Sequence, residues 1–246
     1  MQKEPSSGHA SARATPPARA AGRFSRPPRS RLVLVVGGFV ALFACLLVFG
    51  AIAEDVHEQE ANALDALATP LLHGLSNPIL DAIMRALTDL GSTIVVVPLF
   101  VVALALLIWR RHRREALFLA ASMAGSLVIN ESLKLIFHRP RPQLAWAQVQ
   151  PESSFPSGHA MNSLVFYVAV ALIIWVFWGR RAGLIAAVLA LVLALLIGTS
   201  RIYLGYHYFT DVVGGLFAGA AWLLIVSAAF DGGFWLRRWR AEEPGP

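Results

Sequence analysis

The stretch AMNSLVFYVAVALIIWVFW-GRR-AGLIAAVLALVLALLIGT, residues 160–199, places two long apolar runs on either side of Gly-Arg-Arg. Each run, 160–178 and 182–199, is close to the roughly 20 residues that a helix needs to cross the hydrocarbon core of a bilayer. Four further runs of this kind occur at 32–53, 93–109, 116–133 and 212–230. The sequence therefore predicts an all-α fold, a bundle of six transmembrane helices.

The composition also indicates a membrane protein. Of 246 residues, 57% are hydrophobic and 15% are charged, whereas soluble domains carry about 25% charged residues. The net charge of +6 comes from 19 Arg and 2 Lys against 15 acidic residues. These cations lie between apolar runs, which fits the charge rule of membrane proteins and not a nucleic-acid-binding surface. The one cysteine, Cys45, excludes an intrachain disulfide and a cysteine-based zinc site.

The distribution of Lys and Arg predicts the orientation in the membrane. Sixteen of the 21 lie in the two terminal segments and in the connections at 110–114 and 180–181, and five lie in the other connections. Basic residues concentrate on the cytoplasmic side. We therefore expect both termini to be cytoplasmic and the other connections to face outward.

Three regions follow from this pattern. Residues 1–31 hold seven basic residues and five prolines, so we expect a disordered basic cytoplasmic tail. Residues 32–236 form the membrane domain, and 237–246 form a short cytoplasmic tail. The Ala-Ile-Ala end of the first run resembles a signal-peptidase site, but the run is longer than the apolar part of a signal peptide, so we interpret it as an uncleaved anchor.

The first outer connection, Glu54–Ser92, contains an amphipathic pattern. After Asn77-Pro78, a typical helix start, apolar residues recur at helical spacing: Ile79, Leu80, Ile83, Met84, Leu87 and Leu90. We predict an amphipathic interfacial helix between the first and second spans. It either lies on the membrane surface or packs as a short helix on the bundle, and both interpretations stay open.

Most outer cations gather in two connections that also carry histidines and acidic residues. Three of them suit a polyanionic group such as phosphate, namely Lys134, Arg141 and Arg201. The segment Pro156-Ser157-Gly158-His159 stands where the fourth span begins. The hydroxyl of Ser157 and the free amides at a helix start favour an anion, and Gly158 permits its close approach.

The same connections carry a set of residues for nucleophilic chemistry. His207 and Asp211 are spaced i and i+4, so the carboxylate can reach and orient the imidazole. His159 comes from the other connection and offers a second proton-transfer group. One histidine as nucleophile and the other as general acid suffice for phosphoester hydrolysis.

These residues form the pattern Lys134-x6-Arg141-Pro142, Pro156-Ser157-Gly158-His159 and Ser200-Arg201-x5-His207-x3-Asp211. The pattern resembles the three-part signature of the phosphatidic acid phosphatase type 2 superfamily at all eleven specified positions. The resemblance covers about residues 54–230. It implies a phosphate held by Lys134, Arg141, Arg201, Ser157 and the amide of Gly158. It also implies that His207 attacks phosphorus to form a phosphohistidine, that His159 protonates the leaving group, that Asp211 orients His207, and that no metal or cofactor is required.

Metal-dependent alternatives fit this sequence less well. His138, His159 and His207 lack the short-range spacing of helix-borne zinc ligands, and three cations nearby would repel the metal. A magnesium site would need several carboxylates, whereas the two connections offer Glu152 and Asp211.

Several neighbouring residues have two possible roles. His138 and Arg139 either line the site or pack at the interface. Glu131, three residues before Lys134, either pairs with that lysine or faces the bundle. The glycines 214, 215 and 219 favour close helix packing over a substrate path.

We therefore expect a lipid phosphatase whose partners are a lipid phosphate and the membrane, not nucleic acid. The arginine-rich composition suggests a bacterium with a GC-rich genome, with the site on the periplasmic or outer side of the cell membrane. Candidate substrates are undecaprenyl pyrophosphate, phosphatidylglycerol phosphate, phosphatidic acid and lipid A phosphate; family analogy favours the first. The alternatives are a phosphotransferase with the same site and a transporter or lipid-binding protein without chemistry.

Overall fold

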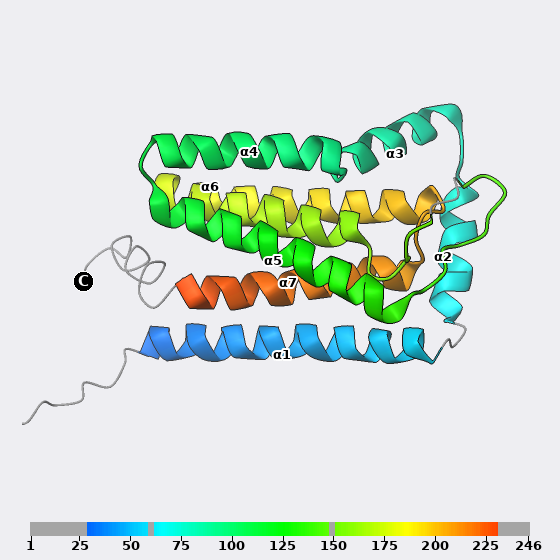
Figure 1. The fold of residues 1–246 in the computed structure, drawn as a ribbon, viewed down its shortest axis with the longest axis horizontal. Coiled ribbons are helices and arrows are strands. Elements are labelled where there is room, and N and C mark those ends of the chain that lie inside the picture. The colour runs from blue at the N-terminus through cyan, green and yellow to red at the C-terminus, as the bar shows by residue number, and fades with distance from the viewer. Residues whose placement is uncertain (1–28, 59–61, 148–150, 231–246) are drawn as a thin grey trace, which may run out of the picture.

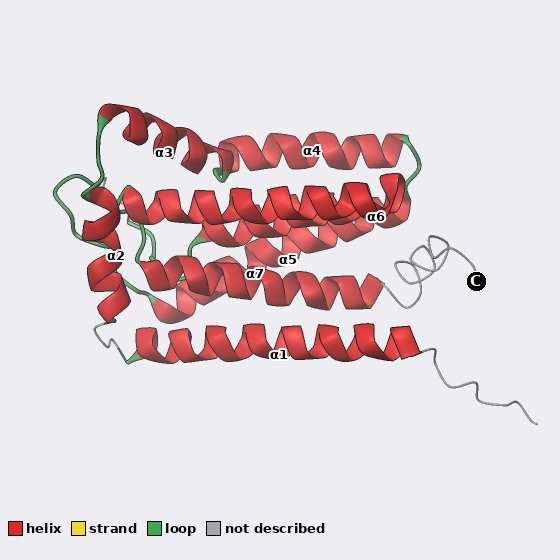
Figure 2. Ribbon diagram, turned by 180° about the vertical axis from the view of Figure 1, so that it is seen from behind, coloured by secondary structure: helices red, strands yellow, loops and turns green. Residues whose placement is uncertain are grey.

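The computed structural model describes residues 29–58, 62–147 and 151–230. Within these ranges the chain is all-helical, and the long helices run side by side while α2 lies across one end of the bundle (Figures 1 and 2). The helices are α1 (Arg29–His57), α2 (Ala63–His73), α3 (Pro78–Leu90), α4 (Thr93–Trp109), α5 (Arg113–Phe137), α6 (Gly158–Tyr203) and α7 (Phe209–Phe230). The predicted all-α class is confirmed.

Helix α6 is a hairpin of two helical arms. It has 46 residues, and Gly179 interrupts it with φ 85° and ψ 177°. A straight helix of this length would extend about 69 Å, yet a Cβ on Gly198 would lie 3.9 Å from the Cβ of Ala160 at the other end. The arms are therefore antiparallel, and the Gly-Arg-Arg sequence forms the turn between them.

The number of helices that could span a membrane differs from the number of apolar runs. Four helices are long and apolar enough to span a membrane: α1, α5, α6 and α7. A fifth span results if α3 and α4, bent by 42° at a short break, are taken together. All six predicted runs lie in helices, but two of them share α6. The protein is an integral membrane protein, and six crossings remain a prediction.

The first outer connection contains two helices, of which only the second was predicted. Helix α3 begins at Pro78 as expected, because the side chain of Asn77 accepts hydrogen bonds from the amides of Ile79 and Leu80. One face of α3 packs on α6, where Thr88 accepts a hydrogen bond from Arg201. This contact supports the interpretation as a packing helix. A place at the membrane surface stays a prediction.

Helix α2 was not predicted from the sequence because it is short, at 11 residues, and contains Pro70. Asn62 caps its start by accepting a hydrogen bond from the amide of Leu64, and Asp65 in its first turn is buried. The helix packs against α6 and α7. It therefore covers the end of the bundle at which these two helices meet.

The predicted terminal tails lie largely outside the described residues. Helix α1 begins at Arg29, three residues before the predicted run, whereas residues 1–28 and 231–246 are not described.

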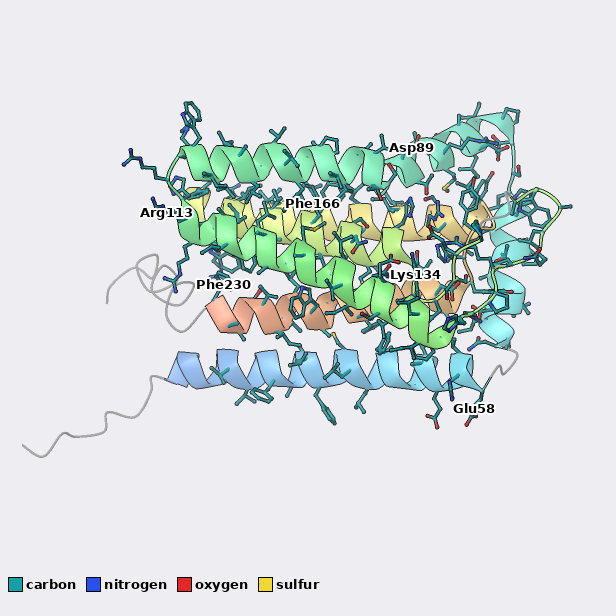
Figure 3. All side chains as sticks on the ribbon, in the orientation of Figure 1. Glu58, Asp89, Arg113, Lys134, Phe166 and Phe230 are labelled. Atoms are coloured by element: carbon teal, nitrogen blue, oxygen red, sulfur yellow. The ribbon has the colours of Figure 1, made fainter. Side chains whose placement is uncertain are left out.

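Small residues allow the helices near the site to approach closely. A Cβ on Gly215 of α7 would lie 2.7 Å from the backbone oxygen of Ser157, and one on Gly219 would lie 3.0 Å from that of Met161. The predicted packing role of these glycines is confirmed. As Figure 3 shows, Lys134 lies toward the α2 end of the bundle and Arg113 at the opposite end.

Candidate active site

The three signature segments meet at the end of the bundle that α2 covers. The loop between α5 and α6 carries Arg141, the start of α6 carries His159, and the loop after α6 carries His207. The backbone amide of Ser157 donates a hydrogen bond to the carbonyl oxygen of Asp211 over 3.0 Å, which joins the start of α6 to the start of α7. His159 lies within electrostatic range of His207 and of the predicted cations Lys134, Arg141 and Arg201.

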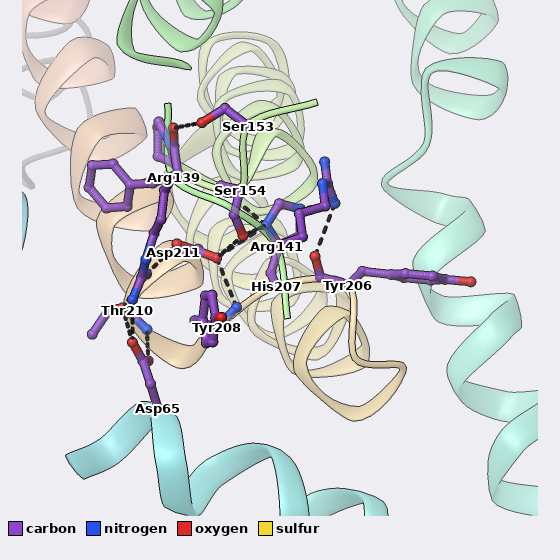
Figure 4. A network of polar contacts seen from close by, with 12 residues as sticks. Asp65, Arg139, Arg141, Ser153, Ser154, Tyr206, His207, Tyr208, Thr210 and Asp211 are labelled. Atoms are coloured by element: carbon purple, nitrogen blue, oxygen red, sulfur yellow. Dashed lines mark hydrogen bonds and ion pairs between the residues drawn. The ribbon is translucent and has the colours of Figure 1, made fainter. Parts of the chain in front are cut away.

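His207 is buried, and its two ring nitrogens have different surroundings (Figure 4). Nδ1 lies 2.8 Å from the carbonyl oxygen of Ser154, whereas Nε2 lies 3.4 Å from Nη1 of Arg141. A carbonyl oxygen can only accept a hydrogen bond, so Nδ1 carries the proton. Nε2 is then unprotonated, and its lone pair faces the Nη1 donor of Arg141.

Burial lowers the pKa of His207 to about 4, while Asp211 opposes this shift and the charges of Arg201 and Arg141 add to it. The imidazole is therefore neutral at pH 7. A neutral imidazole with an unprotonated Nε2 is the form required of a nucleophile.

Asp211 is buried and has more partners than the predicted histidine. Its carboxylate accepts hydrogen bonds from the hydroxyl of Ser154, from the backbone amide of Tyr208 at 2.8 Å and from Nη1 of Arg139 at 2.6 Å. The distance from its Oδ2 to Nδ1 of His207 is 3.5 Å. Asp211 and His207 are thus neighbours, but the carbonyl of Ser154 makes the shorter contact with the imidazole.

Ser154 and Asp65 are residues that sequence reasoning missed. Ser154 has no motif of its own, although its place two residues before Pro156 could have suggested a site-lining residue. Arg139, left open from the sequence, contacts Asp211 and therefore belongs to the site. His138 is exposed, with a ring nitrogen 3.4 Å from the carbonyl oxygen of Ile136.

The guanidinium groups of Arg141 and Arg201 each have fixed partners within the protein. Arg141 donates to the carbonyl oxygens of Glu152 and Tyr206, each over 3.0 Å. Arg201 donates through Nη1 to Thr88 over 2.9 Å and stacks on the ring of Tyr206 at 4.3 Å. Each arginine is therefore oriented before any ligand binds.

Two buried hydrogen-bond donors in this region lack a partner among the described residues, namely Nε of Arg201 and the hydroxyl of Ser157; the acceptor Oδ1 of Asn130, beside Gly158, lacks one as well. Leaving such a group unsatisfied costs about 1–3 kcal/mol. Ser157 also makes no capping hydrogen bond at the start of α6, which leaves the first amides of the helix open to an anion. An oxyanion would satisfy all of these donors.

Lys134 has two carboxylate neighbours. Its Nζ lies 3.1 Å from Glu131 and 3.2 Å from Glu152, which confirms the pairing with Glu131. The charge of Lys134 lowers the pKa of Glu152. Both carboxylates are largely exposed, so an incoming anionic ligand would compete with them for the lysine.

The described residues contain no group of three or more His, Cys, Asp or Glu side chains placed to hold a metal ion. The zinc alternative built on His138, His159 and His207 thus has no support in the geometry. The donors that converge here are cations, a hydroxyl and helix amides, which suit an anion.

Known lipid phosphatases resemble this chain in sequence. The sequence profile of the PAP2 superfamily matches residues 115–235. Phosphatidylglycerophosphatase B of Bacillus subtilis is 29% identical over 78% of this chain and 94% of its own length. Undecaprenyl-diphosphatase BcrC of the same organism is 32% identical over 59% of this chain and 73% of its own length.

A solved structure agrees with these matches. The transmembrane PAP2-type phosphatidylglycerolphosphate phosphatase of Bacillus subtilis superimposes with a TM-score of 0.70 at 28% identity, covering 76% of this chain and 94% of that one. Sequence and fold together show that this chain belongs to the PAP2 superfamily, as a membrane-embedded lipid phosphatase.

Proposed function

We propose that the enzyme hydrolyses a lipid phosphate or pyrophosphate, without a metal, through a phosphohistidine on His207. The observation that carries this proposal is the buried imidazole of His207, whose Nδ1 contacts the Ser154 carbonyl and whose Nε2 faces Arg141, in the same region as the unpaired donors of Ser157 and Arg201. This arrangement supports the proposal, because an in-line attack on phosphorus requires a nucleophile beside an anion site.

The reaction proceeds in two steps. Arg141, Arg201, Lys134, the hydroxyl of Ser157 and the amide of Gly158 bind the phosphoryl oxygens. Nε2 of His207 attacks phosphorus as the bond to the leaving oxygen breaks, and His159 gives that oxygen a proton. Water then attacks the phosphohistidine, His159 takes a proton from it, and the N–P bond breaks to release phosphate.

Asp211 supports this cycle through charge. During the attack His207 becomes positively charged, and a carboxylate 3.5 Å from its Nδ1 stabilises that charge. The Ser154 carbonyl holds the ring in the required tautomer.

The proposal places the site at the outer face of a bacterial cell membrane. Helix α6 would cross the membrane twice and α4, alone or together with α3, once, so that six crossings place both termini on the same side, which we propose is the cytoplasm. The charge distribution supports this orientation, because the arginines at 110–114 and 180–181 lie at the two connections remote from the signature segments.

We favour undecaprenyl pyrophosphate as the substrate. One relative is named an undecaprenyl-diphosphatase, and recycling of this carrier requires an outward-facing phosphatase. Phosphatidylglycerol phosphate, phosphatidic acid and a lipid A phosphate are the alternative substrates, and a lipid phosphotransferase using the same phosphohistidine is the alternative reaction.

The test is phosphate release by the purified full-length protein in detergent. Undecaprenyl pyrophosphate and the three alternative lipids are compared with EDTA present, and vanadate is added as an inhibitor. We expect turnover in EDTA, inhibition by vanadate, and loss of turnover in His207→Ala and His159→Ala. His57→Ala, at the exposed end of α1, is the matched control and keeps full activity.

Each opposing outcome removes a specific part of the proposal. Activity that disappears in EDTA refutes the metal-free mechanism, and near-normal rates in His207→Ala refute the nucleophile. Phosphate transfer that needs an added alcohol acceptor identifies a phosphotransferase.

A further inference from the structure

We propose that Asp65 and Arg139 are positioning residues that hold the carboxylate of Asp211 in place beside His207, so that α2 forms part of the active site. This inference rests on the proposed role of His207. The signature of the family does not include either residue, and Asp65 lies outside the matched segment 115–235.

Asp65 joins α2 to the start of α7. One carboxylate oxygen accepts a hydrogen bond from the backbone amide of Thr210 over 2.8 Å, and the other accepts from the Thr210 hydroxyl over 2.6 Å. The second oxygen also lies 2.7 Å from Nη2 of Arg139. Asp65 therefore caps the first turn of α7 and anchors a cation next to it.

Arg139 bridges two carboxylates from different helices (Figure 4). Its Nη2 contacts Asp65, while its Nη1 lies 2.6 Å from Oδ1 of Asp211 and 2.8 Å from the hydroxyl of Thr210. The ring of Tyr208 covers the guanidinium at 4.2 Å. Because Nη1 and Nη2 are both bound, the planar guanidinium is held in one orientation. The single ammonium group of a lysine could not make the same pair of contacts.

This arrangement determines which oxygen of Asp211 faces His207. Arg139 occupies Oδ1, so Oδ2 is the atom that receives Ser154 and the amide of Tyr208 and that lies near His207. The contacts thus form a continuous series from Asp65 through Arg139 and Asp211 to His207.

The charge balance explains why Arg139 is needed. The side chains of Asp65 and Asp211 are 7% and 0% exposed, and two buried carboxylates without a cation are strongly unfavourable. Burial disfavours the charge of Arg139, but Asp211 and Asp65 together raise its pKa. One cation therefore partly neutralises both acids.

Removal of Arg139 should also change the basicity of His207. The ionisable groups that act on His207 come from three places: Arg141 and Glu152 in the α5–α6 loop, His159 and Arg201 in α6, and Asp211 in α7. Arg139 acts on His207 through Asp211. Without it, the carboxylate of Asp211 is uncompensated and favours the imidazolium, so the pKa of His207 rises.

The experiment compares three variants of the full-length enzyme. Arg139→Gln removes the bridging cation. Arg139→Lys keeps the positive charge but lacks the two terminal guanidinium nitrogens that contact Asp65 and Asp211. The double variant Asp65→Asn/Arg139→Gln removes one charge of each sign and so keeps the wild-type net charge. It replaces the single variant if Arg139→Gln fails to fold. Asp89→Asn, an exposed acid of α3, is the control.

Three quantities are measured for each protein: the unfolding temperature, kcat and KM for undecaprenyl pyrophosphate, and the pKa of His207 from NMR of histidine labelled with 15N. We expect the double variant to fold, to lose about 100-fold in kcat with little change in KM, and to show a raised His207 pKa. Arg139→Lys should regain part of kcat, and Asp89→Asn should match the wild type.

Wild-type kcat and an unchanged His207 pKa in the folded double variant would overturn the inference and leave a purely structural role. If the wild type released no phosphate from any lipid, the proposed function would fail, but the NMR titration would still decide whether Asp65 and Arg139 act on His207.

Discussion

Substitution of Gly215 by alanine tests whether the start of α6 must occupy its observed position. A Cβ at 215 would lie 2.7 Å from the carbonyl oxygen of Ser157 and 3.4 Å from its nitrogen. Both are backbone atoms, so no side-chain rotation relieves the contact. Ordinary carbon–oxygen contact requires a displacement of about 0.7 Å, and this displacement falls on α7 or on the Pro-Ser-Gly segment.

The expected loss follows from that displacement. The hydroxyl of Ser157 and the amide of Gly158 belong to the proposed phosphate site, and misplacement by about 1 Å costs on the order of 100-fold in rate. We therefore expect Gly215→Ala to reduce kcat/KM by about 10- to 100-fold. Overpacking should also lower the free energy of unfolding by about 1–3 kcal/mol.

The assay is phosphate release from lipid phosphate in detergent, with thermal unfolding measured in parallel. Gly37→Ala is the matched control, because a Cβ at this position of α1 meets nothing within 4 Å. It should keep wild-type activity and stabilise α1 slightly. Wild-type rate and stability in Gly215→Ala would refute the reasoning, as would an equal loss in Gly37→Ala.

Four further outcomes are expected. Because burial lowers the pKa of His207 to about 4, protonation of this nucleophile should reduce kcat/KM only as the pH drops toward 4. A fall in kcat/KM centred near pH 6.5 would show that burial does not lower the pKa of His207. The stability that the neutral imidazole contributes is complete above pH 6.5 and declines below it, which denaturant titrations at several pH values can measure. Ser154→Ala keeps the backbone carbonyl that contacts His207 but removes the hydroxyl that donates to Asp211. The loss of this hydrogen bond should lower the free energy of unfolding by about 1.5–3 kcal/mol and lower kcat. An unchanged free energy of unfolding would argue against the Ser154–Asp211 hydrogen bond. Glu152→Gln frees Lys134 from one carboxylate and should lower KM about two- to fivefold in steady-state assays, whereas a raised KM would show that Glu152 assists binding.

The sequence predicted the helical runs well because their length and apolar character are local properties. The expected runs at 93–109 and 212–230 lie within α4 and α7, and the Asn77-Pro78 start of α3 has the predicted cap. Helix α2 was not predicted, since an 11-residue segment with an internal proline carries a weak periodic signal.

The sequence by itself determined the class of protein, the signature residues and the candidate nucleophile, since run length, charge distribution and motif spacing are readable along the chain. It could not determine which groups orient Asp211. The carboxylate of Asp65 contacts Arg139 across 74 positions and Thr210 across 145, and the docking of α2 on the end of the bundle brings them together. The carbonyl oxygen of Ser154 makes the short contact with Nδ1 of His207 that the sequence had predicted for Asp211. Its position likewise depends on the path of the loop before α6. Tertiary structure decided these contacts because burial and hydrogen bonding between distant segments exist only once the helices have packed.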